Sequence, residues 1–418
     1  MQSFARAWVE TGPRVHDCLA RGGRVLVHCR GGLGRAGTVA AQILMEQGMA
    51  ARQAIARIRQ ARKGAIETPA QEKYLADMAA RDHGLVARRI EASLLAGAMG
   101  DALGAEIEFW KLAEIRRAYP TGFDGLPPHA GMTGAITDDT QMTLFTAEGL
   151  INAHVRYYFK GICHPPSVVH HALLRWYVTQ GGKPRREVDD RGLVADPRLH
   201  HQRAPGNTCL SALGAAEHFG DMARNDSKGC GTIMRVAPVA FSGVNDVAAL
   251  AMETSALTHG HVTGQEAAAA WALILRDVFE GKGSPEQAAR ALLGHFGAET
   301  DAALRAALAA PRDGRAETVE GLGGGWVAEE ALAIALYACL CAADLEHGLS
   351  IAVTHSGDSD STGAIAGNLL GLMFPDQVFA HRWADEVECR DLIGRLAGDL
   401  SACLAGEIEG LEERYPGW

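Results

Sequence analysis

The stretch IEASLLAGAMGDALG, residues 90–104, is rich in alanine, leucine and glycine, and its apolar residues recur with helical spacing. Three later stretches have the same character: TGQEAAAAWALILRDVFEGK (263–282), SPEQAARALLGHF (284–296) and AEEALAIALYACLCAADL (328–345). The segments between them offer no convincing series of alternating strands. The sequence therefore predicts an all-α domain over residues 88–418, with close helix packing and a mobile glycine-rich loop, GLGGGW, at Gly321–Trp326.

Residues 1–85 differ in character and are predicted to form a separate, short α/β segment. RVLVHC (Arg24–Cys29) is β-branched and predicts a strand, which a glycine-rich turn follows. TVAAQILMEQG (38–48) and ARQAIARIRQAR (51–62) have helical spacing, and a third helix is expected to run toward Asp82.

The length and composition indicate a globular protein of two or three domains. The chain has 418 residues, of which 47% are hydrophobic and 22% charged. No apolar run approaches the roughly 18 residues that cross a bilayer, and the opening lacks a secretory pattern. The nine cysteines form no CxxC pair, which favours free thiols in a reducing compartment. We therefore expect a cytoplasmic protein with no membrane partner.

Charge is distributed unevenly along the chain. Residues 1–90 contain 15 Lys and Arg against 7 Asp and Glu, whereas the rest of the chain carries 25 against 43. A basic first part attracts phosphate groups, yet it lacks the interleaved aromatics and motifs of a nucleic-acid binder. Nucleic acid is therefore not an expected partner.

The turn after the predicted strand has phosphate-handling features. It reads HCRGGLGRAGT, from His28 to Thr38, with five residues between Cys29 and Arg35. Between a strand and a helix, backbone N–H groups form an anion cradle that lowers the pKa of a thiol, and an arginine grips phosphate in bidentate fashion. The alternative is a plain glycine-rich turn with an incidental cysteine.

These residues resemble the signature loop of protein tyrosine and dual-specificity phosphatases, and AIETPAQ resembles the segment that follows it there. The resemblance implies Cys29 as nucleophile and Arg35 as phosphate ligand, with Gln71 a weaker match. It covers residues 1 to about 85, the trailing half of such a domain. The family's acid is an aspartate well upstream of the cysteine, and Asp17 is too close to fill that role. We expect weak or absent phosphatase turnover.

Two short acidic stretches precede helical runs in the second part. Thr137-Asp138-Asp139-Thr140 and Asp358-Ser359-Asp360-Ser361-Thr362-Gly363 each read, alone, as a helix N-cap. Together they offer four carboxylates and several hydroxyls, a hard-oxygen set suited to Mg²⁺, Mn²⁺ or Ca²⁺. An EF-hand is excluded because the twelfth position is Leu369 rather than a glutamate. The sharper interpretation is a two-metal site.

Six motifs occur in the order seen in ADP-ribosylglycohydrolases, relatives of the enzyme that removes ADP-ribose from dinitrogenase reductase. They are GAMGDALGAEIEF (97–109), TDDTQMTL (137–144), APGNTCLSAL (204–213), SKGCGTIMRVAPVA (227–240), ALTHGH (256–261) and GDSDSTGAIAGNLLG (357–371). The chain is similar to this family over roughly residues 88–418. The resemblance implies an all-α fold and a binuclear Mg²⁺ site, with Mn²⁺ as an alternative ion. The implied metal ligands are Thr137, Asp138, Asp139, Asp358, Asp360 and Ser361.

The same resemblance assigns roles to residues outside the two acidic stretches. Glu108 matches a glutamate that approaches the scissile ribose. Either Glu108 or Asp139 would transfer the proton. Asp101 stays outside the predicted site, because it can equally anchor its own helix or support a ligand from behind. The residues expected to line the substrate are Gly229, Cys230, Gly231 and His259.

The resemblance predicts a Mg²⁺-dependent hydrolase that releases ADP-ribose from an ADP-ribosylated protein or a small ADP-ribose conjugate. The bond cleaved would be that at C1 of the distal ribose, through an oxocarbenium-like state. Three alternatives stay open: a cysteine-dependent phosphatase, a bifunctional phosphatase and ADP-ribosyl hydrolase, and a non-catalytic ADP-ribose-binding module.

Overall fold

The computed structural model describes residues 2–47, 49 and 51–415 as two compact units. Unit 1 comprises the described residues up to Val86 together with Ala405–Glu407, and unit 2 comprises Ala87–Leu404 and the described residues from Ile408 onward. The boundary falls within one long helix, α4 (Pro69–Gly104), so the helix predicted to run toward Asp82 continues into the next predicted helix.

Unit 1 is helical. Its other helices are α1 (Gln2–Ala20), α2 (Gly34–Glu46) and α3 (Ala51–Ala61). A small apolar core forms around Ala41, Ala54, Ile66 and Leu75, where α2, α3 and the start of α4 meet.

The predicted strand Arg24–Cys29 is wrong. These residues carry neither helix nor strand between α1 and α2. In the part of the chain that the structure describes, β-structure is limited to isolated bridges, all of them beyond residue 119. A β-branched run needs a neighbouring strand to pair its N–H and C=O groups, and the described part of unit 1 supplies none.

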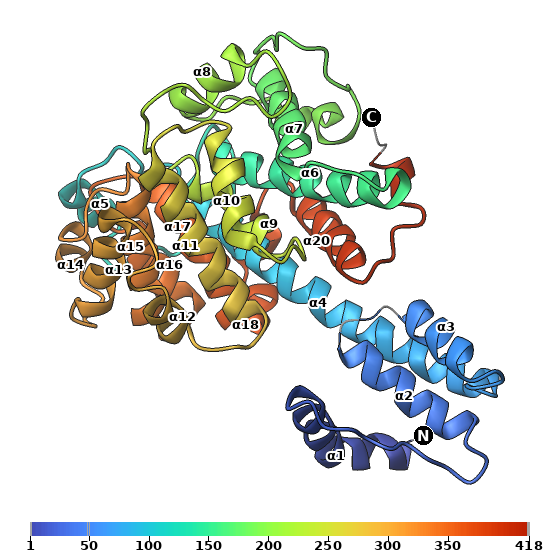
Figure 1. The fold of residues 1–418 in the computed structure, drawn as a ribbon. Coiled ribbons are helices and arrows are strands. Elements are labelled where there is room, and N and C mark those ends of the chain that lie inside the picture. The colour runs from blue at the N-terminus through green and yellow to red at the C-terminus, as the bar shows by residue number, and fades with distance from the viewer. Residues whose placement is uncertain (1, 48, 50, 416–418) are drawn as a thin grey trace. The chain divides into compact units, whose positions relative to one another are not determined.

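Unit 2 is all-α, as predicted (Figure 1). Its further α-helices are α5 (Leu112–Ala118), α6 (Asp138–Lys160), α7 (Pro165–Thr179), α8 (Asn207–Ala215), α9 (Ala237–Ala240), α10 (Val247–Ala256), α11 (Val262–Phe279), α12 (Pro285–Ala291), α13 (Ala298–Ala309), α14 (Ala316–Glu320), α15 (Ala328–Cys341), α16 (Leu345–Val353), α17 (Ser359–Met373), α18 (Pro375–Ala380), α19 (Trp383–Glu386) and α20 (Arg390–Leu404). Short 3₁₀ helices are η1 (Gly192–Ala195), η2 (Pro197–Leu199), η3 (Ile233–Arg235) and η4 (Leu411–Glu413). Among the described residues, no helix is long and apolar enough to span a membrane.

The helices that carry the acidic stretches lie at the centre of unit 2. Every residue from 138 to 153 of α6 is buried, as is every residue of α17 from 359 to 372. α17 packs against the second half of α4 with backbone against backbone, because three α17 glycines spaced four apart each face an α4 carbonyl. The facing pairs are Gly363 with Gly100, Gly367 with Ala96, and Gly371 with Ala92.

Candidate metal centre and substrate cavity

The first acidic stretch begins α6 as an N-cap, which is the role expected of it alone. Thr137 has extended backbone geometry, and its Oγ1 accepts a hydrogen bond from the Asp139 N–H at 3.3 Å. Asp138 and Asp139 occupy the first turn and are only 5% and 2% exposed. The Asp138 Oδ2 accepts from the Gly206 N–H at 3.2 Å, whereas the Asp139 Oδ1 has no hydrogen-bond partner.

Asp101 of α4 holds this loop from behind. Its carboxylate accepts hydrogen bonds from the Thr137 N–H at 3.0 Å and the Thr140 N–H at 3.1 Å. The Thr140 hydroxyl donates a third, at 2.5 Å. Burial, followed by the charge of Asp360, raises the pKa of Asp101 to about 7. Asp101 therefore supports the loop that carries Asp138 and Asp139.

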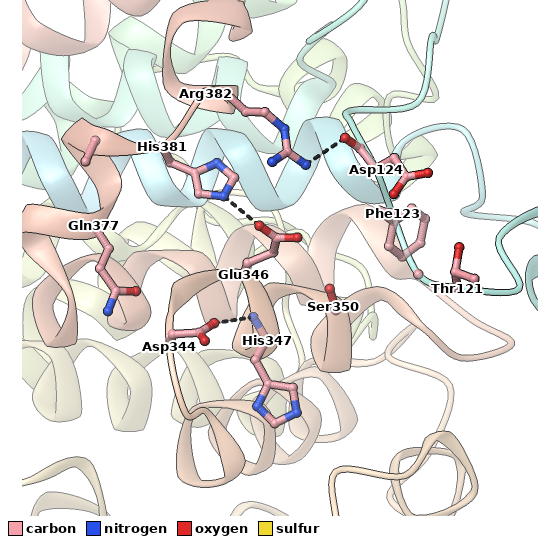
Figure 2. A pocket seen from close by; sticks show the side chains of 12 residues that line it. Thr121, Phe123, Asp124, Asp344, Glu346, His347, Ser350, Gln377, His381 and Arg382 are labelled. Carbon is pink, nitrogen blue, oxygen red and sulfur yellow. Dashed lines mark hydrogen bonds and ion pairs between the residues drawn. The ribbon is translucent and has the colours of Figure 1, made fainter.

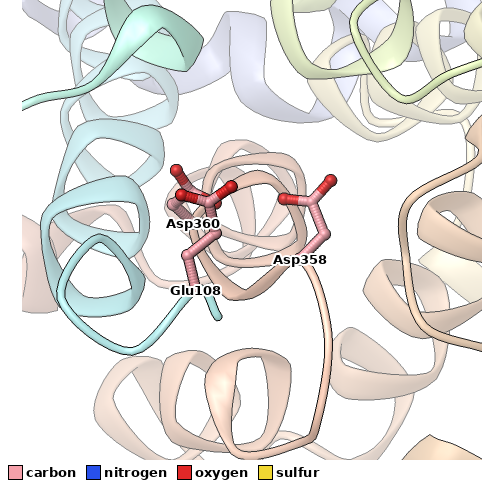
Figure 3. A group of neighbouring side chains, drawn as sticks. All are labelled: Glu108, Asp358 and Asp360. Atoms are coloured by element: carbon pink, nitrogen blue, oxygen red, sulfur yellow. The ribbon is translucent and has the colours of Figure 1, made fainter. Parts of the chain in front are cut away.

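The second acidic stretch begins α17 opposite the first. The Asp358 N–H donates to the Gly324 carbonyl at 2.8 Å, and the Asp360 Oδ1 accepts from the Ser361 N–H at 2.9 Å. Carboxylate oxygens of Glu108, Asp358 and Asp360 lie within 4.8 Å of one another (Figure 3). The structure thus brings Glu108, predicted from a third motif, to the acidic stretch at the start of α17. We call Glu108, Asp358 and Asp360, together with Asp138 and Asp139 of the first stretch, the acidic cluster.

The acidic cluster holds more negative charge than its surroundings compensate. Burial, and then the charges of Asp360 and Asp358, raise the pKa of Glu108 to about 10. Burial and the Asp360 charge likewise raise the pKa values of Asp138 and Asp139 well above the ordinary range of aspartate. Hard oxygen donors crowded in this way, one of them unpartnered, fit divalent cations that take oxygen ligands.

The acidic cluster opens into a cavity of about 370 Å³. Thr137 is the one predicted site residue of unit 2 that does not line this cavity. The predicted residues that line the cavity are Glu108, Asp138, Asp139, Gly229, Cys230, Gly231, His259, Asp358, Asp360 and Ser361.

His259 and the glycines at 229 and 231 form one wall of this cavity. The imidazole lies against both glycines, so that a side chain at Gly231 would press on the ring. The His259 Nδ1 is 2.9 Å from the Thr258 hydroxyl, and burial followed by the charge of Arg235 lowers the pKa of His259 to about 3. His259 is therefore a neutral group in the cavity wall.

Cys230 contacts the acidic cluster itself, in addition to lining the cavity. Its thiol donates to the Asp358 Oδ2 at 2.8 Å and lies 3.6 Å from the Ser361 Oγ. Burial and then the Asp358 charge raise the pKa of the Cys230 thiol. The thiol therefore fixes one oxygen of a predicted metal ligand, as a hydrogen-bonded neighbour commonly does at metal sites.

Several lining residues were not among the predicted site residues. Ala204–Cys209 belongs to a motif noted in the sequence, but no role was assigned to it. Phe109 follows Glu108 directly, and Trp326 ends the glycine-rich loop. Met234 lies one turn beyond Cys230. Phe109 could have been included from the sequence because it is next to Glu108. No spacing in the sequence connects Phe109 with Trp326.

A larger cavity of about 960 Å³ lies elsewhere in unit 2, and none of the predicted site residues lines it. Its prominent charged groups already have partners, as Figure 2 shows. The His381 Nε2 is 2.9 Å from a Glu346 carboxylate oxygen, and Arg382 donates to the Asp124 carbonyl at 2.6 Å. We therefore assign the candidate site to the smaller cavity with the acidic cluster.

The Cys29 loop of unit 1 forms without the predicted strand. The Gly32 N–H donates to the Cys29 Sγ at 3.2 Å, and α2 begins at Gly34. The backbone N–H of Ala36, then those of Gly32 and Gly31 and the charge of Arg35, lower the pKa of the Cys29 thiol. The side chains of Gln71 and Glu67 lie beside Gly34, so Gln71 is next to the loop.

Comparisons with known proteins agree with this division of the chain. A family model described as ADP-ribosylglycohydrolase matches residues 82–410, and one described as "Swiss Army Knife protein, DSP-PTPase phosphatase domain" matches residues 10–75. An uncharacterised protein of Archaeoglobus fulgidus is 27% identical over 316 residues, which cover 73% of this chain and 94% of that protein. A solved structure titled "ADP-ribosylglycohydrolase-related protein complex" is 26% identical, with a TM-score of 0.53, and the match covers 76% of this chain and 98% of that one.

Proposed function

Because the chain belongs to the ADP-ribosylglycohydrolase family, we propose that unit 2 is a metal-dependent hydrolase that cleaves the glycosidic bond between ADP-ribose and an acceptor. The acceptor is a protein side chain or the remainder of a related ADP-ribose conjugate. The observation that carries this proposal is the buried acidic cluster around Glu108, Asp358 and Asp360 at one wall of the cavity.

The cation proposed for the cluster is Mg²⁺, as two ions, with Mn²⁺ as the alternative. The proposed ligands are Thr137, Asp138, Asp139, Asp358, Asp360 and Ser361. Bound cations of this kind polarise a substrate oxygen and lower the pKa of a coordinated water. The unpartnered Asp139 Oδ1 supports this assignment, because a buried carboxylate oxygen without a partner is costly.

The protein's own groups would position the ribose and move the proton. Glu108 lies beside Asp358 and Asp360 in the cavity wall, so it is placed to protonate the atom that leaves C1. Asp139 is the alternative proton carrier. His259 would offer the substrate a neutral hydrogen-bonding ring, and the missing side chains of Gly229 and Gly231 leave room for the substrate beside it.

The experiment that tests this function measures free ADP-ribose released from arginine-, serine- and threonine-linked mono-ADP-ribosylated substrates. Release is expected from at least one linkage with Mg²⁺, and EDTA should abolish it because the carboxylates then lack their counter-charge. Adding excess Mg²⁺ should restore the rate. Equal release with and without EDTA would contradict metal dependence, and silence across the panel with ADP-ribose still bound would favour a binding module.

The Cys29 loop favours a second candidate function in unit 1, the binding of phosphate groups. The lowered thiol pKa and the inward N–H groups support it. Turnover is a separate matter, because the carboxylate of Asp17 in helix α1 is paired with Arg21, directly after that helix, at 3.0 Å. We expect p-nitrophenyl phosphate hydrolysis to stay near the rate of the Cys29→Ser variant. A strong rate that this substitution removes would overturn the expectation.

A further inference from the structure

A buried arginine lies behind the cavity wall that carries His259. Arg235, at the end of η3, is 1% exposed, and within the described part of the chain no carboxylate forms an ion pair with it. Burial lowers the pKa of Arg235 to about 10, so its guanidinium is still a cation at neutral pH. A buried cation without a counter-charge is costly, so its hydrogen bonds are what stabilise it there.

The hydrogen bonds of Arg235 lead to the cavity wall. Its Nε donates to the Gly231 carbonyl at 3.0 Å. Its Nη2 donates to the Thr254 carbonyl at 3.0 Å and to the Thr258 Oγ1 at 2.9 Å. Gly231 and His259 line the cavity, whereas Arg235 and Thr258 do not. The guanidinium therefore acts on the wall from behind, through the hydroxyl of Thr258.

The Thr258 hydroxyl has one proton to donate, and its neighbours decide where that proton goes. The His259 Nδ1 is 2.9 Å away, whereas the Ser255 carbonyl is 3.4 Å away. The Ser255 carbonyl already accepts the N–H groups of Thr258 at 3.1 Å and of His259 at 3.0 Å, which occupy its two lone pairs. Burial raises the pKa of the neighbouring Cys209 thiol to about 12, so Cys209 stays protonated and is a weak acceptor. The hydroxyl therefore donates to the His259 Nδ1.

This hydrogen bond determines which ring nitrogen of His259 carries the proton. The ring is neutral, and a neutral imidazole that accepts at Nδ1 has its N–H at Nε2. The Nε2 lies 3.2 Å from the place where a Cβ on Gly229 would be, and 3.3 Å from the corresponding place on Gly231. This edge of the ring therefore faces the space that the two glycines leave in the cavity wall.

We propose that Arg235 and Thr258 are positioning residues that hold His259 as an Nε2–H donor, so that this wall of the cavity binds an oxygen acceptor of the substrate. The inference rests on the proposed function, in which that oxygen belongs to ADP-ribose. Donation from the guanidinium polarises the Thr258 hydroxyl and strengthens its own donation to Nδ1. A substrate N–H in the same place would meet the Nε2–H donor to donor, so the wall selects for an acceptor.

The test reads the tautomer of His259 and the affinity for ADP-ribose in the wild-type protein and in Thr258→Val. NMR of the ligand-free protein with isotope-labelled histidine identifies the protonated ring nitrogen, and the His259 signals are those that His259→Gln lacks. We expect the proton at Nε2 in the wild type and a mixture of tautomers in Thr258→Val. The Kd of ADP-ribose with Mg²⁺ should rise roughly threefold to tenfold, as for one lost hydrogen bond. Thr258→Ser keeps the hydroxyl and should restore both readouts.

Thr254→Val is the matched control, because it also removes a buried hydroxyl, one that donates to the Leu250 carbonyl of its own helix α10 at 2.8 Å. It should leave the tautomer and the Kd unchanged, and circular dichroism identifies any variant that misfolds. A wild-type ring protonated at Nδ1, or a tautomer that Thr258→Val does not alter, would overturn the assignment. An equal loss of affinity in both valine variants would reduce Thr258 to a packing role. Because neither readout needs turnover, a wild type that gives both expected results without releasing ADP-ribose contradicts the proposed hydrolysis alone.

Discussion

Asp360→Asn is expected to lower the rate of ADP-ribose release roughly a thousandfold, a loss at the upper end of that for one electrostatic group in an active site. The carboxylate of Asp360 lies within 4.8 Å of those of Glu108 and Asp358, and its charge contributes to the raised pKa values of Asp101, Asp138 and Asp139. It is therefore the central charge of the acidic cluster. Asparagine keeps the shape but removes the charge that would hold a cation.

The measurement pairs kcat with a calorimetric Mg²⁺ titration, and both should fall together. Asp376→Asn is the matched control, because the same change at a 93% exposed side chain on α18 should leave both unaltered. A variant with full activity and unchanged Mg²⁺ affinity would be strong evidence against this metal site. Loss of activity with unchanged Mg²⁺ affinity would show that Asp360 contributes to the reaction without holding the cation.

Gly363→Ala is expected to lower the free energy of unfolding by about 3 kcal/mol, the upper part of the range for overpacked cores. A Cβ at Gly363 would collide with the Gly100 backbone carbonyl, which cannot rotate away as a side chain does. Where a helix has open space beside a glycine, the same change raises the free energy of unfolding by about 1 kcal/mol. The sign of the change therefore reports whether the backbone contact is present.

Gly398→Ala in α20 provides that open reference, since nothing lies within 4 Å of the position where its Cβ would be. Urea unfolding of the two variants should therefore show opposite shifts of the midpoint. Equal midpoints would contradict the backbone contact between α4 and α17. Because Asp360 lies one turn before Gly363, the destabilised variant should also bind Mg²⁺ more weakly.

The sequence was sufficient to predict the helices of unit 2 and the N-cap at Thr137. Alanine-rich helical spacing and Thr137 before two aspartates are local signals, and the structure agrees with both. The strand at Arg24–Cys29 was predicted wrongly, since β-structure depends on a partner that local composition does not reveal.

The assembly of the site depended on the family resemblance. Asp138 and Asp358 are separated by more than two hundred residues, and no spacing rule brings such positions together. The stacking of Phe109 on Trp326 and the thiol of Cys230 on Asp358 were likewise not predicted, because each depends on a contact between distant segments. The residue types in the sequence indicated which chemical groups the site contains, whereas only the fold showed which of these groups lie close together.

The bonds from Asp101 to the loop that begins α6 bear on how the cluster takes up an ion. The backbone N–H groups of Thr137 and Thr140 are satisfied by this carboxylate without any contribution from a cation. Fixing a residue that was free costs about 1 to 2 kcal/mol in conformational entropy, and here folding has already met that cost. Ion binding can then proceed without a disorder-to-order transition, so the ion-free protein should keep its helices and its thermal unfolding should stay cooperative.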